Sequence, residues 1–355
     1  MREQLRESIW SRLKTVAYPG FSRDIVSFGM VRSVEVDDQG RAHIVIVYST
    51  EPERVRQAIA QHVREAVQSI DGIRDVHIEW TPRGPVRPST PQPRKVEGIH
   101  HVIAVASAKG GVGKSTIAVH LAYALKEIGA QVGILDADIY GPSIPTMLAH
   151  TGQPTADAQK RIHPVIAKGL KMMSIGFFLP SEDQALIWRG PMVMKAVHQL
   201  MWDVVWAPLD FLVVDLPPGT GDAQLTLLQE VQLSGAIIVT TPQKVALVDA
   251  RKGVTMFRRL HTPVLGIIEN MAYFRCPNCQ TVVDIFDRGG GRWAAESLQV
   301  PFLGEVPIDP RMRAAADNGK TIFEVAPDAE VARVFLEIAR QLVETLPSSL
   351  TTSPA

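Results

Sequence analysis

The sequence predicts an α/β protein in which a small N-terminal domain precedes a larger, doubly wound domain with a mainly parallel sheet. Three observations support this fold class. Short apolar runs recur along the chain from Ile99 onward, with turn-forming residues on both sides of each run. Helical patterns alternate with these runs, and a proline-rich segment separates them from the first residues of the chain. Strands that are apolar throughout are typical of a parallel sheet covered on both faces.

Residues 1–81 have the pattern of one small α/β domain, in the order helix, strand, strand, helix, strand. The strand-like runs are 30–36, 42–47 and 76–80, and Gln39-Gly40 ends the loop between the first two as in a hairpin. Apolar residues at helical spacing mark the helices. They are Leu5, Ile9, Leu13 and Val16 in the first helix, and Val55, Ile59, Val63 and Val67 in the second.

Residues 82–98 predict a linker, because prolines recur there among Arg, Ser, Thr and Gln. A segment of this composition forms no core and favours an extended spacer. Its basic side chains would suit phosphate, but a solvated linker is the favoured interpretation. The large domain is therefore expected to span 99–346, and the last residues, 347–355, are expected to be disordered.

Five apolar runs of the large domain predict buried strands, and a helix at 116–128 follows the first of them. Gly129 is well placed to end that helix. The C-terminal helix pattern is amphipathic, but its polar face carries acidic as well as basic residues, so packing on the sheet is favoured over membrane binding. The predicted strands are 102–107, 132–135, 211–214, 236–240 and 264–268.

The bulk composition argues against several classes of protein. Lys and Arg number 37, as do Asp and Glu, so no overall field attracts nucleic acid or anionic membranes, although a local basic patch is compatible with this balance. The chain lacks the roughly 18 consecutive apolar residues of a transmembrane helix, and its charged N-terminus lacks the apolar core of a signal peptide. We therefore expect a cytoplasmic protein with no nucleic-acid or membrane partner.

A glycine-rich turn between a buried strand and a helix predicts a phosphate-binding loop. Glycines let backbone N–H groups approach phosphate oxygens, and the helix N-terminus adds the positive end of its dipole. Lys114 would reach the β- and γ-phosphates of a nucleoside triphosphate, and the Ser115 hydroxyl would bind Mg²⁺. A plain glycine turn with a helix cap is a much weaker interpretation, since strand, glycine spacing, lysine and hydroxyl all agree. The expected nucleotide-binding residues are Ala108, Lys109, Gly110, Gly111, Val112, Gly113, Lys114, Ser115 and Thr116.

Carboxylates follow two of the apolar runs. Asp215 ends the run 211–214, where a P-loop enzyme carries the acid that orients Mg²⁺ or its water. Behind it, 216–222 is a rigid turn that would sense the γ-phosphate. Asp136 and Asp138 end another run and share one face if the chain is extended. For Asp136 alone, capping of a helix is an almost equally strong interpretation.

The chain has only two cysteines, Cys276 and Cys279. Their spacing lets two thiolates hold one metal centre, and thiolates suit iron–sulfur clusters or zinc. Two ligands do not complete a four-ligand site, so a closed all-cysteine site needs a second chain, which a twofold homodimer would supply. A shared zinc site, a redox disulfide and inert thiols are the alternatives that composition leaves open.

The phosphate loop departs from the common pattern and thereby resembles one branch of P-loop proteins. Ala108 stands where the first glycine is common, and a second lysine, Lys109, follows it. This arrangement resembles the deviant phosphate loop of the MinD, ParA and nitrogenase iron protein family. The resemblance implies a homodimer that encloses ATP, in which Lys109 crosses to the partner's nucleotide.

Closely spaced motifs lie at 136–143, 188–192, 215–222, 241–243 and 269–271, followed by the cysteine pair. Together they resemble the Mrp/ApbC family of iron–sulfur cluster carrier ATPases. The resemblance implies ATP hydrolysis, in which Lys109, Lys114, Asp138 and Asp215 act, with Mg²⁺ held by Ser115, Asp138 and Asp215. It also implies a labile [4Fe-4S] cluster bridging a homodimer through Cys276 and Cys279, and transfer of that cluster to apo-proteins. Asn270 and the segment beginning at Pro307 would contact adenine, although both could equally be loop structure.

The N-terminal domain resembles the MIP18-type domain through residues 24–31. Several members of that family have a cysteine near the second helix, but residues 1–81 contain none, so direct metal binding by this domain is not expected. The leading hypothesis for the whole chain is an ATPase that carries iron–sulfur clusters. A MinD- or ParA-like positioning ATPase and an ATP-driven reductase are the alternatives.

Overall fold

The computed structural model describes residues 2–19, 24–48, 52–82, 93–139, 141–150, 152–178, 190–219 and 221–346. The chain divides into two compact units, Met1–Thr90 and Pro91–Ala355. The expected tail at 347–355 and residues 83–92 of the expected linker lie outside the described residues, as do Tyr140, Trp188, Arg189 and Thr220 of the sequence motifs. The expected domain boundaries at 81 and 99 stay predictions.

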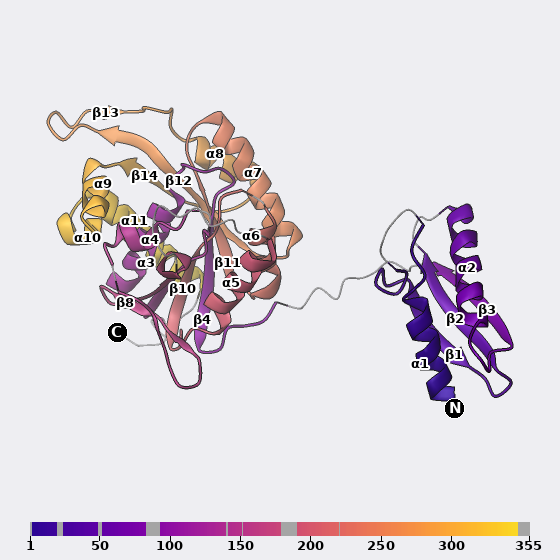
Figure 1. Ribbon diagram of the computed structural model, residues 1–355. Helices are drawn as coiled ribbons and strands as arrows, with labels where there is room; N and C mark the ends of the chain where they lie inside the picture. The colour runs from indigo at the N-terminus through magenta and orange to yellow at the C-terminus, as the bar shows by residue number, and fades with distance from the viewer. Residues whose placement is uncertain are drawn as a thin grey trace. The chain divides into compact units, whose positions relative to one another are not determined.

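The N-terminal unit has the expected order of helices and strands (Figure 1). Strand β1 pairs antiparallel with β2, and β2 pairs parallel with β3, because helix α2 crosses over between them. Both helices bury apolar residues against this sheet, and Val16, expected in the first helix, lies in the same core beyond its end. The bounds are α1 (Arg2–Leu13), β1 (Val31–Val36), β2 (Arg41–Tyr48), α2 (Glu53–Gln68) and β3 (Asp75–Pro82).

A side-chain-capped turn opens the segment 24–31 that carries the family resemblance of this unit. Asp24 accepts hydrogen bonds from the backbone amides of Val26 (2.9 Å) and Ser27 (2.8 Å) and from the Ser27 hydroxyl (2.6 Å). The Ser27 hydroxyl is the largest cause that lowers the pKa of Asp24. Asp24 therefore has a structural role in shaping the turn.

A nine-stranded sheet forms the centre of the second unit in the part of the chain that the structure describes. Its order is β13-β12-β11-β4-β10-β5-β9-β8, with β14 beside β12. From β12 across the sheet to β9, each pair of neighbouring strands is parallel, and β14 is also parallel to β12. Strand β13 pairs antiparallel with β12, and β8 pairs antiparallel with β9. The predicted doubly wound, mainly parallel sheet is confirmed. The strands are β4 (Ile99–Ala106), β5 (Val132–Asp136), β8 (Val165–Ala167), β9 (Leu170–Ser174), β10 (Leu209–Asp215), β11 (Gly235–Thr240), β12 (Val264–Arg275), β13 (Val282–Val283) and β14 (Phe302–Ile308), with β6 (Thr155–Ala156) and β7 (Ile162–His163) as a separate pair.

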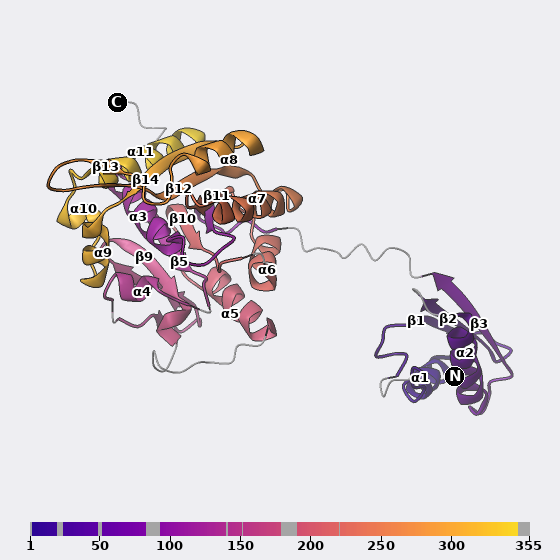
Figure 2. The same ribbon diagram turned by 90° about the horizontal axis from the view of Figure 1, so that it is seen from above.

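Helices cover both faces of this sheet, and each face has its own apolar core (Figures 1 and 2). One core joins the sheet to α3, α4, α9, α10 and α11, and the other joins it to α5, α6, α7 and α8. Every residue of β5, β10 and β11 is buried, which explains their uninterrupted apolar runs. The helices are α3 (Lys114–Glu127), α4 (Ile144–Met147), α5 (Gly190–Trp202), α6 (Asp222–Glu230), α7 (Lys244–Arg259), α8 (Gly290–Leu298), α9 (Pro310–Asp317), α10 (Ile322–Val325) and α11 (Glu330–Thr345), with a 3₁₀ turn at η1 (Ile175–Phe178).

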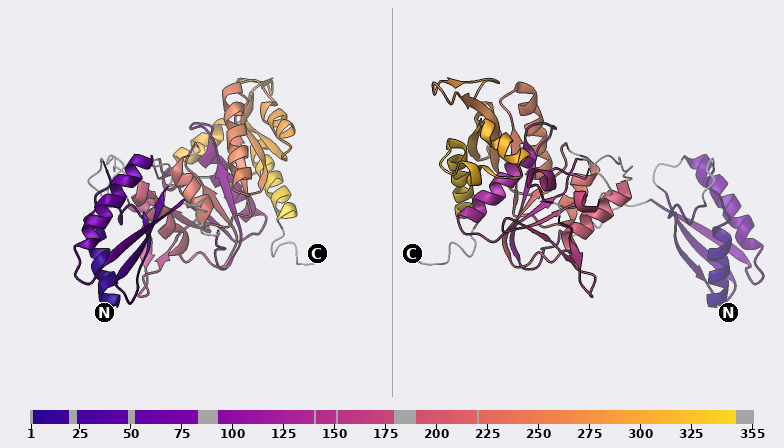
Figure 3. Two further views of the ribbon diagram at one scale, coloured as in Figure 1. Left: turned by 90° about the vertical axis from the view of Figure 1, so that its right-hand side faces the viewer. Right: turned by 60° about the vertical axis from the view of Figure 1, so that its left-hand side comes forward.

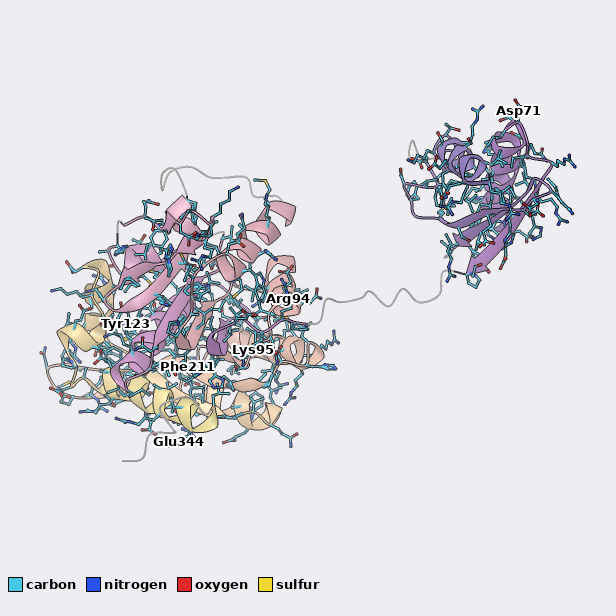
Figure 4. The ribbon with its side chains drawn as sticks, turned by 90° about the horizontal axis from the view of Figure 1, so that it is seen from below. Asp71, Arg94, Lys95, Tyr123, Phe211 and Glu344 are labelled. Carbon is cyan, nitrogen blue, oxygen red and sulfur yellow. The ribbon has the colours of Figure 1, made fainter. Side chains whose placement is uncertain are left out.

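The C-terminal helix α11, yellow in Figure 3, packs against α3 and β14. Its apolar stripe is buried, as the sequence pattern predicted. Tyr123 of α3 and Phe211 of β10, labelled in Figure 4, belong to the core between the helices of this face and the sheet. None of the helices in the described part of the chain is long and apolar enough to cross a bilayer.

Candidate functional site: a nucleotide loop and a cysteine arm

The candidate site lies where the chain order across the sheet reverses. Strand β4 lies between β10 and β11, whereas the next strand in the chain, β5, pairs on the far side of β10. Ligands of doubly wound sheets bind at such a switch point, outside the carboxyl ends of the strands. The loop after β4 and the acids Asp136 and Asp215, which end β5 and β10, all lie at this edge.

The glycine loop between β4 and α3 has the backbone geometry that its sequence predicts. Gly111 and Gly113 have φ of 83° and 81°, a region that side chains with a Cβ disfavour. An added Cβ at Gly110 or Gly111 would meet nothing within 4 Å, so this side of the loop is open for a ligand to approach the backbone. The Ser107 hydroxyl donates to the Lys109 carbonyl (2.9 Å) and helps to fix the start of the loop.

Asn270, which was expected to contact adenine, forms a hydrogen bond with the backbone of the phosphate loop. Its side-chain amide donates to the Val112 carbonyl at 2.8 Å, and the residue is 7% exposed. A Cβ on Gly113 would overlap this amide. The expected adenine contact of Asn270 stays a prediction, and sequence reasoning missed the contact with the loop.

We expect Gly113→Ala to weaken nucleotide binding by about tenfold or more. The positive φ costs an alanine about 1–2 kcal/mol. Where the free loop relieves this strain by changing conformation, nucleotide binding has to restore the conformation, and about 1.4 kcal/mol is a factor of ten in affinity. The overlap with Asn270 adds to this cost by displacing the loop. Calorimetric titration with ADP measures the effect. Gly289→Ala is the matched control, because Gly289 has a similar φ of 82° but lies outside the loop with open space around it. Equal ADP affinities for wild type and Gly113→Ala would contradict the expectation.

Lys114, the first residue of α3, lies between two carboxylates. Its Nζ is 2.6 Å from Asp215 Oδ1 and 3.6 Å from Asp138 Oδ2. The Nζ also lies 3.4 Å from the Ser115 hydroxyl. The structure thus brings together four of the residues that the sequence assigned to phosphate and Mg²⁺ chemistry, although their roles stay predictions.

Asp215 is fully buried, and burial raises its pKa against the opposing effect of Lys114. Its Oδ2 has no hydrogen-bond partner among the described residues. A buried carboxylate oxygen without a donor is costly unless a cation or an ordered water meets it. Asp215 therefore has the chemistry expected of a group that binds Mg²⁺ through water.

Asp136 has a structural role in addition to its place beside the site. Its Oδ2 accepts from the amides of Ser143 (3.1 Å) and Ile144 (3.2 Å) at the start of α4, and from the Ser174 hydroxyl (3.0 Å). Burial, followed by the adjacent Asp215 carboxylate, raises the pKa of Asp136 to about 7. The helix-capping interpretation of Asp136 agrees with these contacts.

Lys109 is exposed beside the glycines, and no carboxylate in the described ranges pairs with its ammonium group. The lysine that lies in the loop and the lysine that begins α3 are therefore in different environments. Lys114 is neutralised within the chain, whereas Lys109 is available to a charge that comes from outside it.

Strand β12 continues past Asn270, and both cysteines follow its last residue. The sequence predicted a strand that stops at 268, but β12 runs to Arg275, and Figure 1 shows it extending with β13 beyond the body of the domain. Cys276 is partly buried and Cys279 is exposed, and both thiols are free. We call this extension, residues 271–283, the cysteine arm.

The loop of the cysteine arm is held by its own hydrogen bonds. The amide of Cys276 donates to the Thr281 carbonyl (3.0 Å), and the amide of Gln280 donates to the Cys276 carbonyl (2.9 Å). Cys279 Sγ and Thr281 Oγ1 are 3.2 Å apart, and the Thr281 hydroxyl is the first cause that lowers the pKa of the Cys279 thiol to about 7. Within the described residues, no group of three or more His, Cys, Asp or Glu side chains could hold a metal ion.

A pocket of about 620 Å³ is lined by the cysteine arm, the end of β14 and the first residues of α11. Asn270, which contacts the phosphate loop, is paired with Val306 in the β12–β14 register, and the next residue, Pro307, lines the pocket. The volume is in the range of small-molecule sites. The lining residues are Arg275, Pro277, Gln280, Pro307, Ile308, Asp309, Pro310, Arg311, Asp328, Ala329, Glu330 and Arg333.

His120 is a buried residue of α3 that sequence reasoning missed as part of the site's support. Its Nδ1 hydrogen bonds to the Thr116 carbonyl (2.8 Å), and its Nε2 accepts from the Ile322 amide (3.4 Å). Its ring stacks on Phe335 at 5.2 Å between centroids. Burial lowers the pKa of His120 to about 4, because desolvation disfavours the charged imidazolium more than the hydrogen bond to the Thr116 carbonyl favours it.

We expect this histidine to make the large domain sensitive to acid. Between pH 6.5 and 4 the unfolded chain binds a proton at His120 and the folded chain does not, so stability falls as pH falls. At about 1.4 kcal/mol per pKa unit, the loss is up to about 3 kcal/mol. His120→Gln keeps a donor and an acceptor without titrating, and urea unfolding at a series of pH values should show a flatter dependence. The exposed His261→Gln is the control, and equal slopes for both variants would refute the assignment.

The fold and the site together define a P-loop nucleotide-binding protein, because a glycine loop joins a central parallel strand to a helix that begins at its lysine. Residues 98–343 match the family described as NUBPL iron-transfer P-loop NTPase, and the chain belongs to this family. Residues 6–80 match the family described as iron-sulfur cluster assembly protein. The resemblances drawn from the motifs are thereby confirmed for both parts of the chain.

Three relatives illustrate the similarity. An iron-sulfur cluster carrier protein of Deinococcus radiodurans is 42% identical over 341 residues, which cover 95% of this chain and 95% of that protein. One of Aquifex aeolicus is 52% identical over 258 residues, or 72% of this chain and 71% of that protein. The iron-sulfur cluster transfer protein NUBPL of Mus musculus is 46% identical over 261 residues, or 73% and 82%.

Two solved structures resemble the large domain. A nucleotide-binding protein of Archaeoglobus fulgidus in complex with ADP superposes with a TM-score of 0.58 at 39% identity, over 66% of this chain and 92% of that one. The septum site-determining protein MinD of Pyrococcus horikoshii, complexed with Mg-ADP, gives a TM-score of 0.52 at 20% identity, over 70% and 97%. The second likeness concerns the fold alone.

Proposed function

We propose that this protein binds and hydrolyses ATP and carries a labile [4Fe-4S] cluster, which two copies of the chain hold between them and deliver to apo-proteins. The observation that carries this proposal is the path of β12. Asn270 in this strand donates to the phosphate loop, and Cys276 follows the strand's last residue. Six residues of strand span at most about 20 Å, so one continuous strand joins the nucleotide loop to the thiol pair.

The cluster is the cargo of the protein, and the cysteine arm is the group that holds it. Each chain supplies Cys276 and Cys279, so two chains related by a twofold axis supply four thiolates, the usual complement of a [4Fe-4S] cluster. A pKa of about 7 makes the Cys279 thiolate available at neutral pH. The exposure of Cys279 suits a ligand that must release the cluster to an acceptor protein.

The nucleotide site fits ATP with Mg²⁺. The open backbone at Gly110 and Gly111 and the unpartnered Oδ2 of Asp215 support this fit. Ser115, Asp138 and Asp215 would hold Mg²⁺, which supplies charge neutralisation at the phosphates when bound. Lys114 would exchange its carboxylate partners for the β- and γ-phosphates.

Lys109 would act on the nucleotide of the partner subunit. Its exposure and its lack of a carboxylate partner in the described ranges favour a role across an interface. We place the base of ATP near Asn270 and Pro307, because Asn270 contacts the phosphate loop and Pro307 lines the 620 Å³ pocket. We further propose that the protein works in the cytoplasm, on apo iron–sulfur proteins, without nucleic-acid or membrane partners.

Anaerobic reconstitution with iron and sulfide tests the proposal. The full chain should give a brown protein with the absorption and Mössbauer spectra of a [4Fe-4S] cluster, one cluster per two chains by sedimentation and iron analysis. The loaded protein should then restore activity to the apo-form of a [4Fe-4S] enzyme, and should hydrolyse ATP.

A colourless protein after reconstitution would defeat the carrier function. A coloured monomer would defeat the shared site. ATP-dependent pelleting with liposomes or DNA, without a cluster, would instead support the positioning ATPase.

A further inference from the structure

Arg275 is the last residue of β12 and stands directly before the first cysteine. Its Nε donates to Glu330 Oε2 at 2.8 Å and its Nη2 donates to Glu330 Oε1 at 3.2 Å, so the pair is bidentate. The remaining nitrogen, Nη1, donates to the Gln280 carbonyl at 3.4 Å. The Arg275 guanidinium group therefore connects Gln280, which follows Cys279 in the loop, to Glu330 at the start of helix α11.

Glu330 is well placed to receive this group. It is the first residue of α11, where a negative charge favours the helix dipole. The Tyr273 hydroxyl also donates to it, at 2.9 Å, and the Arg288 guanidinium covers the Tyr273 ring at 4.1 Å. Hydrogen bonding to Arg275 is the first cause that lowers the pKa of Glu330, so the carboxylate stays charged.

The same pair forms part of the wall of the 620 Å³ pocket that we propose for the nucleotide base. Arg275 and Gln280 line it on the side of the cysteine arm, and Pro307, Asp309 and Glu330 line it elsewhere. Helix α11 in turn packs along α3, which begins at Lys114. The Arg275–Glu330 pair thus joins the thiol loop to a pocket wall and to the helix that supports the nucleotide lysine.

We propose that Arg275 is a positioning residue that couples the nucleotide pocket to the cysteine loop, so that nucleotide binding changes how firmly the thiolates hold their cluster. This inference rests on the carrier function proposed above. A nucleotide base in the pocket would contact the wall that contains the Arg275–Glu330 pair, and any shift of Arg275 is transmitted to Gln280 and hence to the loop between the cysteines.

The geometry requires arginine, and this gives a graded test. A lysine keeps the charge but cannot bond both Glu330 oxygens and the Gln280 carbonyl with one planar group. We therefore expect Arg275→Gln and Glu330→Gln to abolish the coupling from its two sides, and Arg275→Lys to retain part of it. Arg340→Gln is the matched control, because it removes the arginine of an exposed Arg–Glu pair in the same helix.

The experiment measures how fast the reconstituted full-length protein loses its cluster to an iron chelator, without nucleotide, with ADP and with a non-hydrolysable ATP analogue. Coupling between two sites commonly changes an affinity by about fivefold or more. We expect wild type and Arg340→Gln to show a rate ratio of at least about this size between nucleotide states. For Arg275→Gln and Glu330→Gln the ratio should approach one, and circular dichroism of each variant checks folding.

A purely structural role for the pair predicts faster cluster loss in every nucleotide state with an unchanged ratio, and that result would overturn the inference. A wild-type rate that is indifferent to nucleotide would overturn it as well, while leaving the carrier function intact. A wild type that takes up no cluster would remove the carrier function and this inference with it. Because the three results differ, the experiment distinguishes failure of the coupling through Arg275 from failure of the carrier function.

Discussion

Replacing Cys276 by serine is expected to remove the cluster from the protein. In a homodimer the substitution acts twice, so the number of thiolates falls from four to two. Loss of a residue that merely orients a metal ligand costs about 10–100-fold in affinity, and loss of two ligands should cost more. After anaerobic reconstitution, Cys276→Ser and Cys279→Ser should stay colourless and transfer nothing to an apo-enzyme, while ATP hydrolysis reports that the large domain is folded.

Thr281 offers a graded version of this experiment. Its hydroxyl lies 3.2 Å from Cys279 Sγ and lowers the pKa of that thiol. Thr281→Val should therefore raise the pKa of Cys279 and move the pH at which the cluster binds upward, whereas Thr281→Ser, which keeps a hydroxyl, should not. Serine variants of the cysteines that load clusters as wild type does would show that the site lies elsewhere.

Much of the nucleotide site was predictable because its signals are local. The apolar run of β4, the two glycines with positive φ and the lysine at the start of α3 lie within sixteen residues of chain, 99–114. Asp215 was predictable too, since a buried strand that ends in a carboxylate is a local pattern. The register then places Asp215 beside Asp136, as expected for neighbouring parallel strands.

The support around the site was not predictable, because it depends on partners far away in the sequence. Asn270 and Val112 are 158 residues apart, and His120 and Ile322 are 202 residues apart. The extent of β12 was missed for a different reason. Met271 has φ of 57° and the β12–β14 register shifts after Asn270, so the pattern of alternation breaks although the strand continues. The link between the nucleotide loop and the cysteines is a consequence of that continuation.

Replacing Lys114 by methionine is expected to have the second large effect, and it acts on both hydrolysis and stability. Removing one donor to a developing negative charge slows an enzyme by about 10²–10³-fold, and Lys114 is the buried cation of the loop. The substitution also leaves Asp215, fully buried, without the cation 2.6 Å away. Breaking a buried ion pair in this way costs about 3 kcal/mol or more, reduced to the extent that Asp215 takes up a proton.

The double variant Lys114→Met with Asp215→Asn separates the two effects. It removes the uncompensated charge, so chemical unfolding should show that most of the lost stability returns. Hydrolysis should not return, because neither the lysine nor the carboxylate is present to act on the phosphates and Mg²⁺. If stability and hydrolysis instead recovered together, Lys114 would act only by neutralising Asp215, and the phosphates would have to be bound by other groups. If neither the single nor the double variant lost hydrolysis, the assignment of Lys114 to catalysis would be wrong.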